Sequence, residues 1–388
     1  MCNALSFACL SIVVVLTVMV SSQTTTRYTN IVLEGGGLKG MAYIGAAKAF
    51  ADTGYYVHNR YAFTNITGTS IGCLFGYALA LDVSPWDLEK LVMGTNISTL
   101  LDDNTHALVD FPRYRDENEN EDGFGFVTIY RRMRYLFRLV LYVSRMKAVW
   151  AQDGSPGISR GHSILLWIMR NLTSLSPYSE RLRVDSTMLD LKEITGHDLT
   201  CIATRLARPH VARFNAEITP HAKIHDAIYA SIAVPFVFKP LNDDNGNILV
   251  DGGLIRNFAI YEYDYNGVKS PTTLGLSLHG EYDEEDEIER RRTRRDSPSR
   301  FARITDTRFT RKLLDVIFNE KSYMDYASDA RNCDRVVFLD SRLRWFDFDV
   351  SDEDVQRDIA RAYSKTRDHL INSNACRRNE DTWIGKWL

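Results

Sequence analysis

The chain has 388 residues, 45% of them hydrophobic, which is enough for one large globular domain or two small ones. Its net charge of -3 shows no basic excess, so the composition argues against a nucleic-acid-binding protein. Six scattered cysteines show no metal-like spacing and predict no disulfide framework.

An uncharged apolar run, Ala4 to Val20, stands near the start of the chain. Over residues 1–22 it indicates a signal peptide, with Val20-Ser21-Ser22 as the cleavage site, or a short membrane anchor. We therefore expect a membrane-associated or secretory-pathway protein. The run has no Lys or Arg before it, so its orientation stays open, as does a location on the cytosolic face.

The first glycine motif, Gly35-Gly36-Gly37-Leu38-Lys39-Gly40, follows the strand-like run Ile31 to Leu33 and opens a helix expected over about Lys39 to Phe50. Glycines leave backbone N–H groups uncovered, and such donors can stabilise an oxyanion. Lys39 would add a positive charge nearby. The alternative is a dinucleotide-binding loop, but that requires an acidic residue at the end of the second strand.

That second strand, predicted over Tyr61 to Ile66, instead leads into Gly68-Thr69-Ser70-Ile71-Gly72. A G-x-S-x-G pattern between a strand and a helix is typical of a nucleophile elbow, in which flanking glycines avoid collisions in a strained turn. The helix is expected to continue to about Leu81. Ser70 is therefore the candidate nucleophile, placed at a helix N-terminus that favours anionic character.

The middle of the chain carries charged, variable-looking segments. A polar loop over Asp116 to Asp122 precedes a basic and apolar segment over Tyr130 to Lys147. A basic amphipathic helix can lie on an anionic lipid surface, although a helix packed on the core with a solvated charged face fits equally well. We assign residues 102–185 to a variable helical cap.

A third glycine motif, Asp251-Gly252-Gly253, follows the strand-like run Ile248 to Val250. An Asp-Gly pair alone is a common hairpin turn. Beside a candidate nucleophile, Asp251 becomes a candidate base, and burial would raise its pKa toward the range that a base needs. The two glycines fit a turn that packs close to the elbow.

Further along, a strand-like stretch over Thr272 to Leu278 ends at His279. Ser70, Asp251 and His279 follow the chain order of α/β-hydrolase triads, and His369 is a weaker third member. Residues 281–300 form a charged insertion, and Ser351 to Asp354 resembles a capping box that begins the last helix.

The three motifs in this order resemble the patatin-like phospholipase family. The block Ala230-Ser231-Ile232-Ala233-Val234-Pro235-Phe236 and the segment Phe346-Asp347-Phe348 are also similar to that family. Lys39 is a departure from the pattern of that family, in which arginine is common at this position. The resemblance implies a Ser70–Asp251 dyad in a three-layer α/β sandwich with a mostly parallel central sheet, spanning residues 28–372 ahead of a tail over 373–388. Because no calcium or zinc ligand constellation appears in the sequence, we expect no cofactor and no metal site.

These observations predict a phospholipase A-type acyl hydrolase that cleaves fatty-acyl esters of membrane phospholipid at a membrane surface. Its oxyanion hole would be the segment Gly35 to Gly40. Two alternatives stay open: a neutral-lipid lipase or transacylase with a Ser70–Asp251–His279 triad, or a catalytically silent membrane-binding protein.

Overall fold

The computed structural model describes residues 27–95, 162–207, 209–235, 238–278, 332, 334–343 and 350–372. Its strands are β1 (Asn30–Leu33), β2 (Tyr56–Val57), β3 (Arg60–Tyr61), β4 (Asn65–Thr69), β5 (Asp198–Arg205), β6 (His210–Phe214), β7 (Leu241–Asn242), β8 (Ile248–Asp251), β9 (Thr273–Ser277) and β10 (Val336–Phe338). Its helices are α2 (Ala42–Asp52), α3 (Ile71–Ala80), α4 (Pro85–Met93), α6 (His162–Leu175), α7 (Met188–Thr195), α8 (Ile224–Ile232) and α13 (Asp352–Ile371), with short 3-10 turns η1 (Gly37–Met41) and η4 (Gly252–Leu254).

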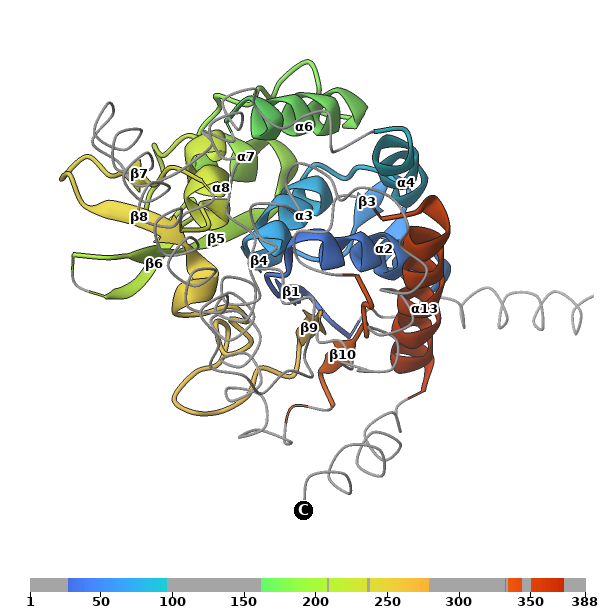
Figure 1. Cartoon of the computed structure of the whole chain (residues 1–388). Helices are drawn as coiled ribbons and strands as arrows, with labels where there is room; N and C mark the ends of the chain where they lie inside the picture. Colours follow the sequence, from blue (N-terminus) through green and yellow to red (C-terminus); the bar gives the residue numbers. More distant parts are fainter. Residues whose placement is uncertain are drawn as a thin grey trace, which may run out of the picture.

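One mixed sheet organises these elements (Figure 1). Strands β10, β9, β1, β4 and β5 are neighbours in that order and run parallel. Strands β6 and β8 both pair antiparallel with β5, and β7 pairs antiparallel with β8. The predicted α/β class with a mostly parallel sheet is confirmed, and the antiparallel pairs form a corner at one side.

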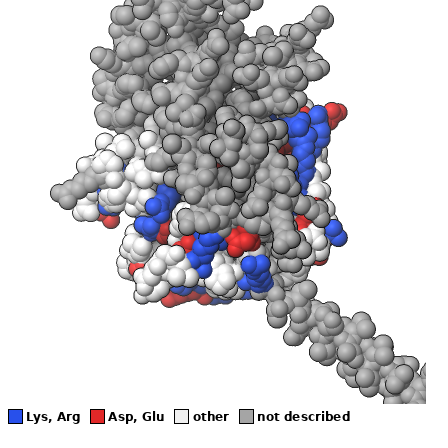
Figure 2. All heavy atoms as spheres, turned by 90° about the horizontal axis from the view of Figure 1, so that it is seen from below, with Lys and Arg blue, Asp and Glu red and all other residues white. Residues whose placement is uncertain are grey.

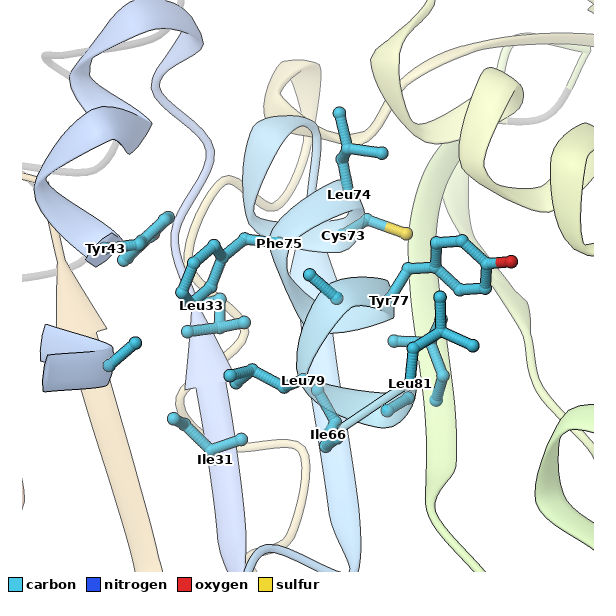
Figure 3. Close-up of a cluster of buried hydrophobic side chains, with 14 of the residues drawn as sticks. Ile31, Leu33, Tyr43, Ile66, Cys73, Leu74, Phe75, Tyr77, Leu79 and Leu81 are labelled. Carbon is cyan, nitrogen blue, oxygen red and sulfur yellow. The ribbon is translucent and has the colours of Figure 1, made fainter. Parts of the chain in front are cut away.

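The strands alternate between two buried faces, as a sheet covered on both sides requires. Ile31 and Leu33 of β1 belong to the main core with helices α2, α3 and α8, whereas Val32 points to the other face. That second face is covered by Ala259 and Ile260, which follow η4. In the close-up, side chains of β1, β4 and α3 meet, with Tyr43 and Phe75 side by side (Figure 3).

Helices α2 and α13 lie side by side although nearly the whole chain separates them (Figure 1). A Cβ atom on Gly45 of α2 would lie only 2.0 Å from the carbonyl oxygen of Ile359 in α13. Glycine is therefore needed for these two backbones to approach so closely. Ser351 caps α13 by accepting a hydrogen bond from the Asp354 N–H, which confirms the predicted start of the last helix.

Three local predictions need correction. The second strand of the main sheet begins at Asn65, since Arg60 and Tyr61 belong to the small β2–β3 hairpin, whose turn residues have positive φ. The first helix is preceded by the 3-10 turn η1, so α2 begins at Ala42.

The third correction concerns the cysteines. Cys73 on α3 and Cys201 on β5 form a disulfide, with their Cα atoms 5.4 Å apart. The prediction of no disulfide framework failed because 128 residues separate the two cysteines, and sequence spacing gives no sign that the fold brings them together.

Charged residues of both signs are interspersed over the described part of the face shown in Figure 2. Within the described ranges, no helix is both long and apolar enough to cross a membrane. The apolar run 4–20, the basic segment 130–147, the insertion 281–300, the segment 346–348 and the tail 373–388 lie outside those ranges. The predicted cap, 102–185, is described only from His162 onward, where α6 packs on the core through Leu165 and Met169.

Candidate active site

Ser70 occupies a strained turn between β4 and α3. Its backbone has φ 53° and ψ -126°, and it is the N-cap residue of α3. A residue other than glycine rarely adopts positive φ, and such strain is concentrated at functional sites. The turn is tight because a Cβ on Gly68 would lie 2.3 Å from the Gly72 carbonyl oxygen, and one on Gly72 would lie 2.5 Å from the Leu33 oxygen. The structure therefore has a strand, a tight turn and a helix around Ser70, the local geometry that the sequence predicted.

The first glycine motif lies directly against this elbow. A Cβ on Gly35 would be 3.1 Å from the Cβ of Ser70, so the loop approaches the serine as closely as packing permits. The Gly35 N–H donates to the Asn257 carbonyl oxygen, whereas the Gly36 and Gly37 N–H groups have no acceptor among the described residues. The loop thus offers two uncommitted backbone donors beside Ser70. Lys39 and Gly40 follow, both buried in η1.

Strand β5 brings Asp251 to Ser70. Thr69, which precedes the serine, pairs with Ile202 of β5, and Asp251 pairs with the next residue, Ala203. The ends of β4 and β8 therefore meet along one edge of β5 (Figure 1). Gly252 permits this approach, because a Cβ there would lie 2.3 Å from the Ile202 carbonyl oxygen and 3.0 Å from the Thr69 side chain.

The Asp251 carboxyl is fully buried. Burial is the main influence on it and raises its pKa to about 7, against the smaller lowering effects of the Gly253 N–H and the Ser70 hydroxyl. The Gly253 N–H donates to Oδ1 at 2.7 Å. The other oxygen, Oδ2, makes no hydrogen bond of ordinary geometry within the described structure. A carboxyl of this pKa can accept a proton near neutral pH.

Glu34, which the sequence analysis missed, holds the glycine loop in place. Its buried carboxylate accepts hydrogen bonds from the Ser277 hydroxyl at 2.6 Å, the Leu278 N–H at 2.7 Å and the Asn257 side-chain amide at 3.2 Å. The same amide donates to the Gly35 carbonyl oxygen at 3.0 Å. The sequence does show Glu34 as a polar residue directly after an apolar strand. It does not show the partners of Glu34, which lie on and just after β9 and in the segment after η4.

Ser231 was also missed as a part of the site, although its block contributed to the family resemblance. Its hydroxyl accepts a hydrogen bond from the Ser70 N–H at 2.9 Å and donates one to the Ile202 carbonyl oxygen at 2.6 Å. The residue is fully buried in the last turn of α8. Nothing local in the sequence indicates that a helix residue 161 positions away touches the elbow.

Of the two histidine candidates, His369 lies in the described part of the chain and does not join this group. His369 lies on α13 with its ring against Tyr28, which precedes β1, so it sits toward the amino ends of the strands, whereas Ser70 follows the carboxyl end of β4. Burial lowers the pKa of His369 to about 4. His279 lies outside the described residues. Among the residues that are described, no three His, Cys, Asp or Glu side chains are grouped to hold a metal ion.

The arrangement has the parts that acyl transfer needs: a hydroxyl at a helix N-terminus, a buried carboxyl beside it, and backbone donors on the adjoining loop. A family model for the patatin-like phospholipases matches residues 31–263, more than half of the chain. That range contains Ser70, Asp251 and the whole glycine loop.

Two curated relatives are similar to this chain. The uncharacterized protein YqhO of Bacillus subtilis (strain 168) is 23% identical over 256 residues, which cover 65% of this chain and 71% of YqhO. The uncharacterized protein R571 of Acanthamoeba polyphaga mimivirus is 24% identical over 265 residues, covering 67% and 69% of the two chains.

Solved structures also align with this chain, at low identity. VipD from Legionella pneumophila aligns with a TM-score of 0.48 and 17% identity, over 89% of this chain and 67% of VipD. The type III effector protein ExoU of Pseudomonas aeruginosa aligns with a TM-score of 0.41 and 14% identity, over 89% of this chain. The chain spans about half of the ExoU chain, 53%.

Proposed function

Because this chain belongs to the patatin-like phospholipase family, a family of lipid ester hydrolases, we propose that it cleaves fatty-acyl esters of membrane phospholipid through a covalent acyl-Ser70 intermediate. Asp251 serves as the base, and the segment from Gly35 to Gly40 supplies the oxyanion hole. The single observation that carries this proposal is the register on β5, where the neighbours Ile202 and Ala203 pair with Thr69 and Asp251.

In the acylation step, the Ser70 Oγ attacks the ester carbonyl carbon while Asp251 takes the hydroxyl proton. The carbonyl oxygen becomes an oxyanion, which the uncommitted N–H groups of Gly36 and Gly37 stabilise together with the positive field of the η1 and α2 N-termini. The bond to the leaving oxygen then breaks, and Asp251 returns its proton to that oxygen. The products are a lysophospholipid and the acyl-Ser70 ester.

In the deacylation step, water attacks the acyl carbon and gives a proton to Asp251. The same oxyanion donors stabilise the second tetrahedral intermediate. When the bond to Ser70 Oγ breaks, Asp251 returns the proton to the serine and a fatty acid leaves. The pKa of about 7 at Asp251 supports this cycle, since a carboxyl of ordinary pKa is a much weaker base for serine.

We further propose that the hydrolase domain spans residues 28–372, with 102–185 as a variable helical cap, and that the protein works at a membrane within the secretory pathway. The apolar run 4–20 supports that location. The Cys73–Cys201 disulfide supports it independently, because disulfides persist in oxidising compartments.

The test is labelling with a fluorophosphonate probe, combined with mass spectrometry of the products released from mixed phospholipid vesicles. Wild type should become labelled and release fatty acid and lysophospholipid, whereas Ser70→Ala should do neither. Ser174→Ala removes an exposed hydroxyl from α6 and should behave as wild type. Labelling of Ser70→Ala at the wild-type rate would assign the nucleophile elsewhere.

The same assay separates the alternatives. A catalytically silent binding protein predicts no labelling of any variant. A triad predicts that His279→Ala loses as much turnover as Ser70→Ala with an unchanged melting temperature. The dyad predicts that His279→Ala and His369→Ala keep substantial activity. Transfer of the acyl group to an added alcohol, in preference to water, would identify a transacylase.

A further inference from the structure

The end of helix α8 holds the backbones of both dyad residues. The Ser70 N–H donates to the Ser231 hydroxyl at 2.9 Å, and the Asp251 N–H donates to the Ala233 carbonyl oxygen at 2.9 Å. Ser231 lies in the last turn of α8, and Ala233 is its C-cap residue. Ser231 and Ala233, two residues apart at the end of α8, thus contact Ser70 after β4 and Asp251 on β8.

The Ser231 hydroxyl has a fixed direction in this arrangement. A hydroxyl has one hydrogen to donate, and that of Ser231 goes to the Ile202 carbonyl oxygen at 2.6 Å. Only lone pairs are left to face Ser70, so the hydroxyl acts as an acceptor for its N–H. Ile202 of β5 pairs with Thr69, and the next residue of β5, Ala203, pairs with Asp251. The Ser231 hydroxyl therefore connects the Ser70 backbone to the strand that places Ser70 and Asp251 side by side.

The Ser70 N–H needs such a partner. As the N-cap residue of α3, Ser70 has no acceptor for its N–H within the helix, and the site is buried. The backbone is also held at φ 53°, a conformation that relaxes unless surrounding contacts maintain it. The Ser231 hydroxyl gives the buried Ser70 N–H an acceptor. It also maintains the positive φ of Ser70, because it can accept that N–H only when the turn has this orientation.

We propose that Ser231 is a positioning residue, whose hydroxyl holds the Ser70 elbow in the orientation that directs Oγ toward the Asp251 carboxyl. This inference rests on the proposed dyad function. The competing explanation is that Ser231 is an ordinary buried hydroxyl that stabilises the fold and leaves the reaction geometry unchanged.

The chain offers a matched control for that explanation. The buried Ser176 hydroxyl accepts the Tyr178 N–H at 3.1 Å and donates to the Leu81 carbonyl oxygen at 2.8 Å. It therefore has the same bonding pattern as Ser231, but it joins the end of α6 to the end of α3, away from Ser70. Replacing either serine by alanine removes the same two kinds of hydrogen bond.

The experiment measures the fluorophosphonate labelling rate of the full chain as a function of pH, with the melting temperature of each variant. We expect Ser231→Ala to label about 100-fold more slowly, since small misplacements of reacting groups have effects of that size. Ser176→Ala should lower the melting temperature by a similar amount and label within twofold of wild type. Ser231→Thr, which keeps the hydroxyl, should recover most of the rate, whereas Ser231→Cys, a poor hydrogen-bonding group of similar shape, should not.

The pH profile adds a readout that stability alone does not move. The Ser70 hydroxyl lowers the pKa of Asp251, so a displaced hydroxyl should shift the acidic midpoint of the labelling profile upward in Ser231→Ala. Ser176→Ala should leave the midpoint unchanged. If Ser231→Ala does not fold, the contrast between the threonine and cysteine variants decides the question.

Two kinds of outcome overturn the inference. Labelling of Ser231→Ala at the wild-type rate, or equal slowing of Ser231→Ala and Ser176→Ala, leaves the proposed function standing and reduces Ser231 to a structural role. Absence of labelling in wild type, or equal labelling of Ser70→Ala, removes the proposed function and this inference together.

Discussion

The parallel half of the sheet and its antiparallel corner make different contributions to the candidate site. The parallel strands β1 and β4 each end in a glycine-rich turn that opens a helical segment, and these turns hold the Gly35–Gly40 loop and Ser70. The corner, where β8 runs antiparallel to β5, supplies Asp251. The placement of Ser70, the proposed nucleophile, therefore depends on a local strand-turn-helix unit, whereas the placement of Asp251, the proposed base, depends on the pairing of strands distant in sequence.

This difference predicts that the two halves can be disabled separately. Changes in the corner should remove the base while the elbow keeps its geometry, and changes that loosen the contact between β5 and α3 should affect both. Four predictions follow this division, from the largest expected effect to the smallest.

Asp251→Asn should remove the contribution of the corner and leave the parallel half intact. The amide cannot accept the Ser70 proton, so we expect phospholipid hydrolysis to fall by about 10²- to 10⁴-fold. In wild type the rate should rise with pH through about 7, the pKa of the Asp251 carboxyl. Asp244→Asn, at an exposed position of the neighbouring β7–β8 turn, serves as the control and should keep the wild-type rate. Retention of half the activity in Asp251→Asn would disprove its role as the base.

The Cys73–Cys201 disulfide joins α3, the helix that follows Ser70, to β5, the strand that pairs with both the parallel strands and the antiparallel corner. It closes a loop of 128 residues, for which the chain-entropy model gives at most about 5 kcal/mol of stability. Reduction should therefore lower the melting temperature markedly, while the double variant Cys73→Ala/Cys201→Ala should not respond to reductant. Intact mass under non-reducing conditions checks the bond directly, and two free thiols at these positions would contradict it.

Asp251→Asn should also stabilise the fold above neutral pH, opposite to its effect on activity. Burial raises the folded-state pKa from 3.8 to about 7, so the folded protein holds this proton more tightly than the unfolded chain. The fold therefore loses stability as pH rises from about 4 to about 7, where the unfolded chain is ionised and folded Asp251 still holds its proton, by about 4 kcal/mol at most. Denaturant unfolding should show the variant to be more stable at pH 8 and the difference to vanish near pH 4. Equal stability of the two proteins at pH 8 would refute the raised pKa.

Two glycines of the antiparallel corner, Gly252 and Gly246, test whether close packing of the backbone places Asp251. Gly252→Ala forces a Cβ to within 2.3 Å of the Ile202 carbonyl oxygen, so we expect a loss of about 3 kcal/mol and of activity. Gly246→Ala places a Cβ in open space and is strained only by φ of +74°, a cost of about 1 kcal/mol with activity retained. Urea unfolding and vesicle hydrolysis measure both quantities. Similar losses in the two variants would mean that close packing at Gly252 is not what places the base.

The sequence by itself determined the local parts of this site. It placed Ser70 in an elbow between a strand and α3, the Gly35–Gly40 loop after β1, and Asp251 at the end of β8, because tight turns and close backbone approaches require glycine at particular spacings. The mostly parallel sheet was implied by the resemblance of these motifs to the patatin-like phospholipase family.

Only the tertiary structure decided which of these parts touch. The register that sets Thr69 and Asp251 on neighbouring residues of β5, the Ser231 bridge, the contacts of Glu34 and the Cys73–Cys201 bond all join residues more than 40 positions apart. Hydrophobic periodicity reports which face of an element is buried, but it carries no information on which distant element packs there. Register and long-range hydrogen bonds are set when the whole core forms, and this is why the position of Asp251 beside Ser70, unlike the turn at Ser70 itself, emerged only from the fold.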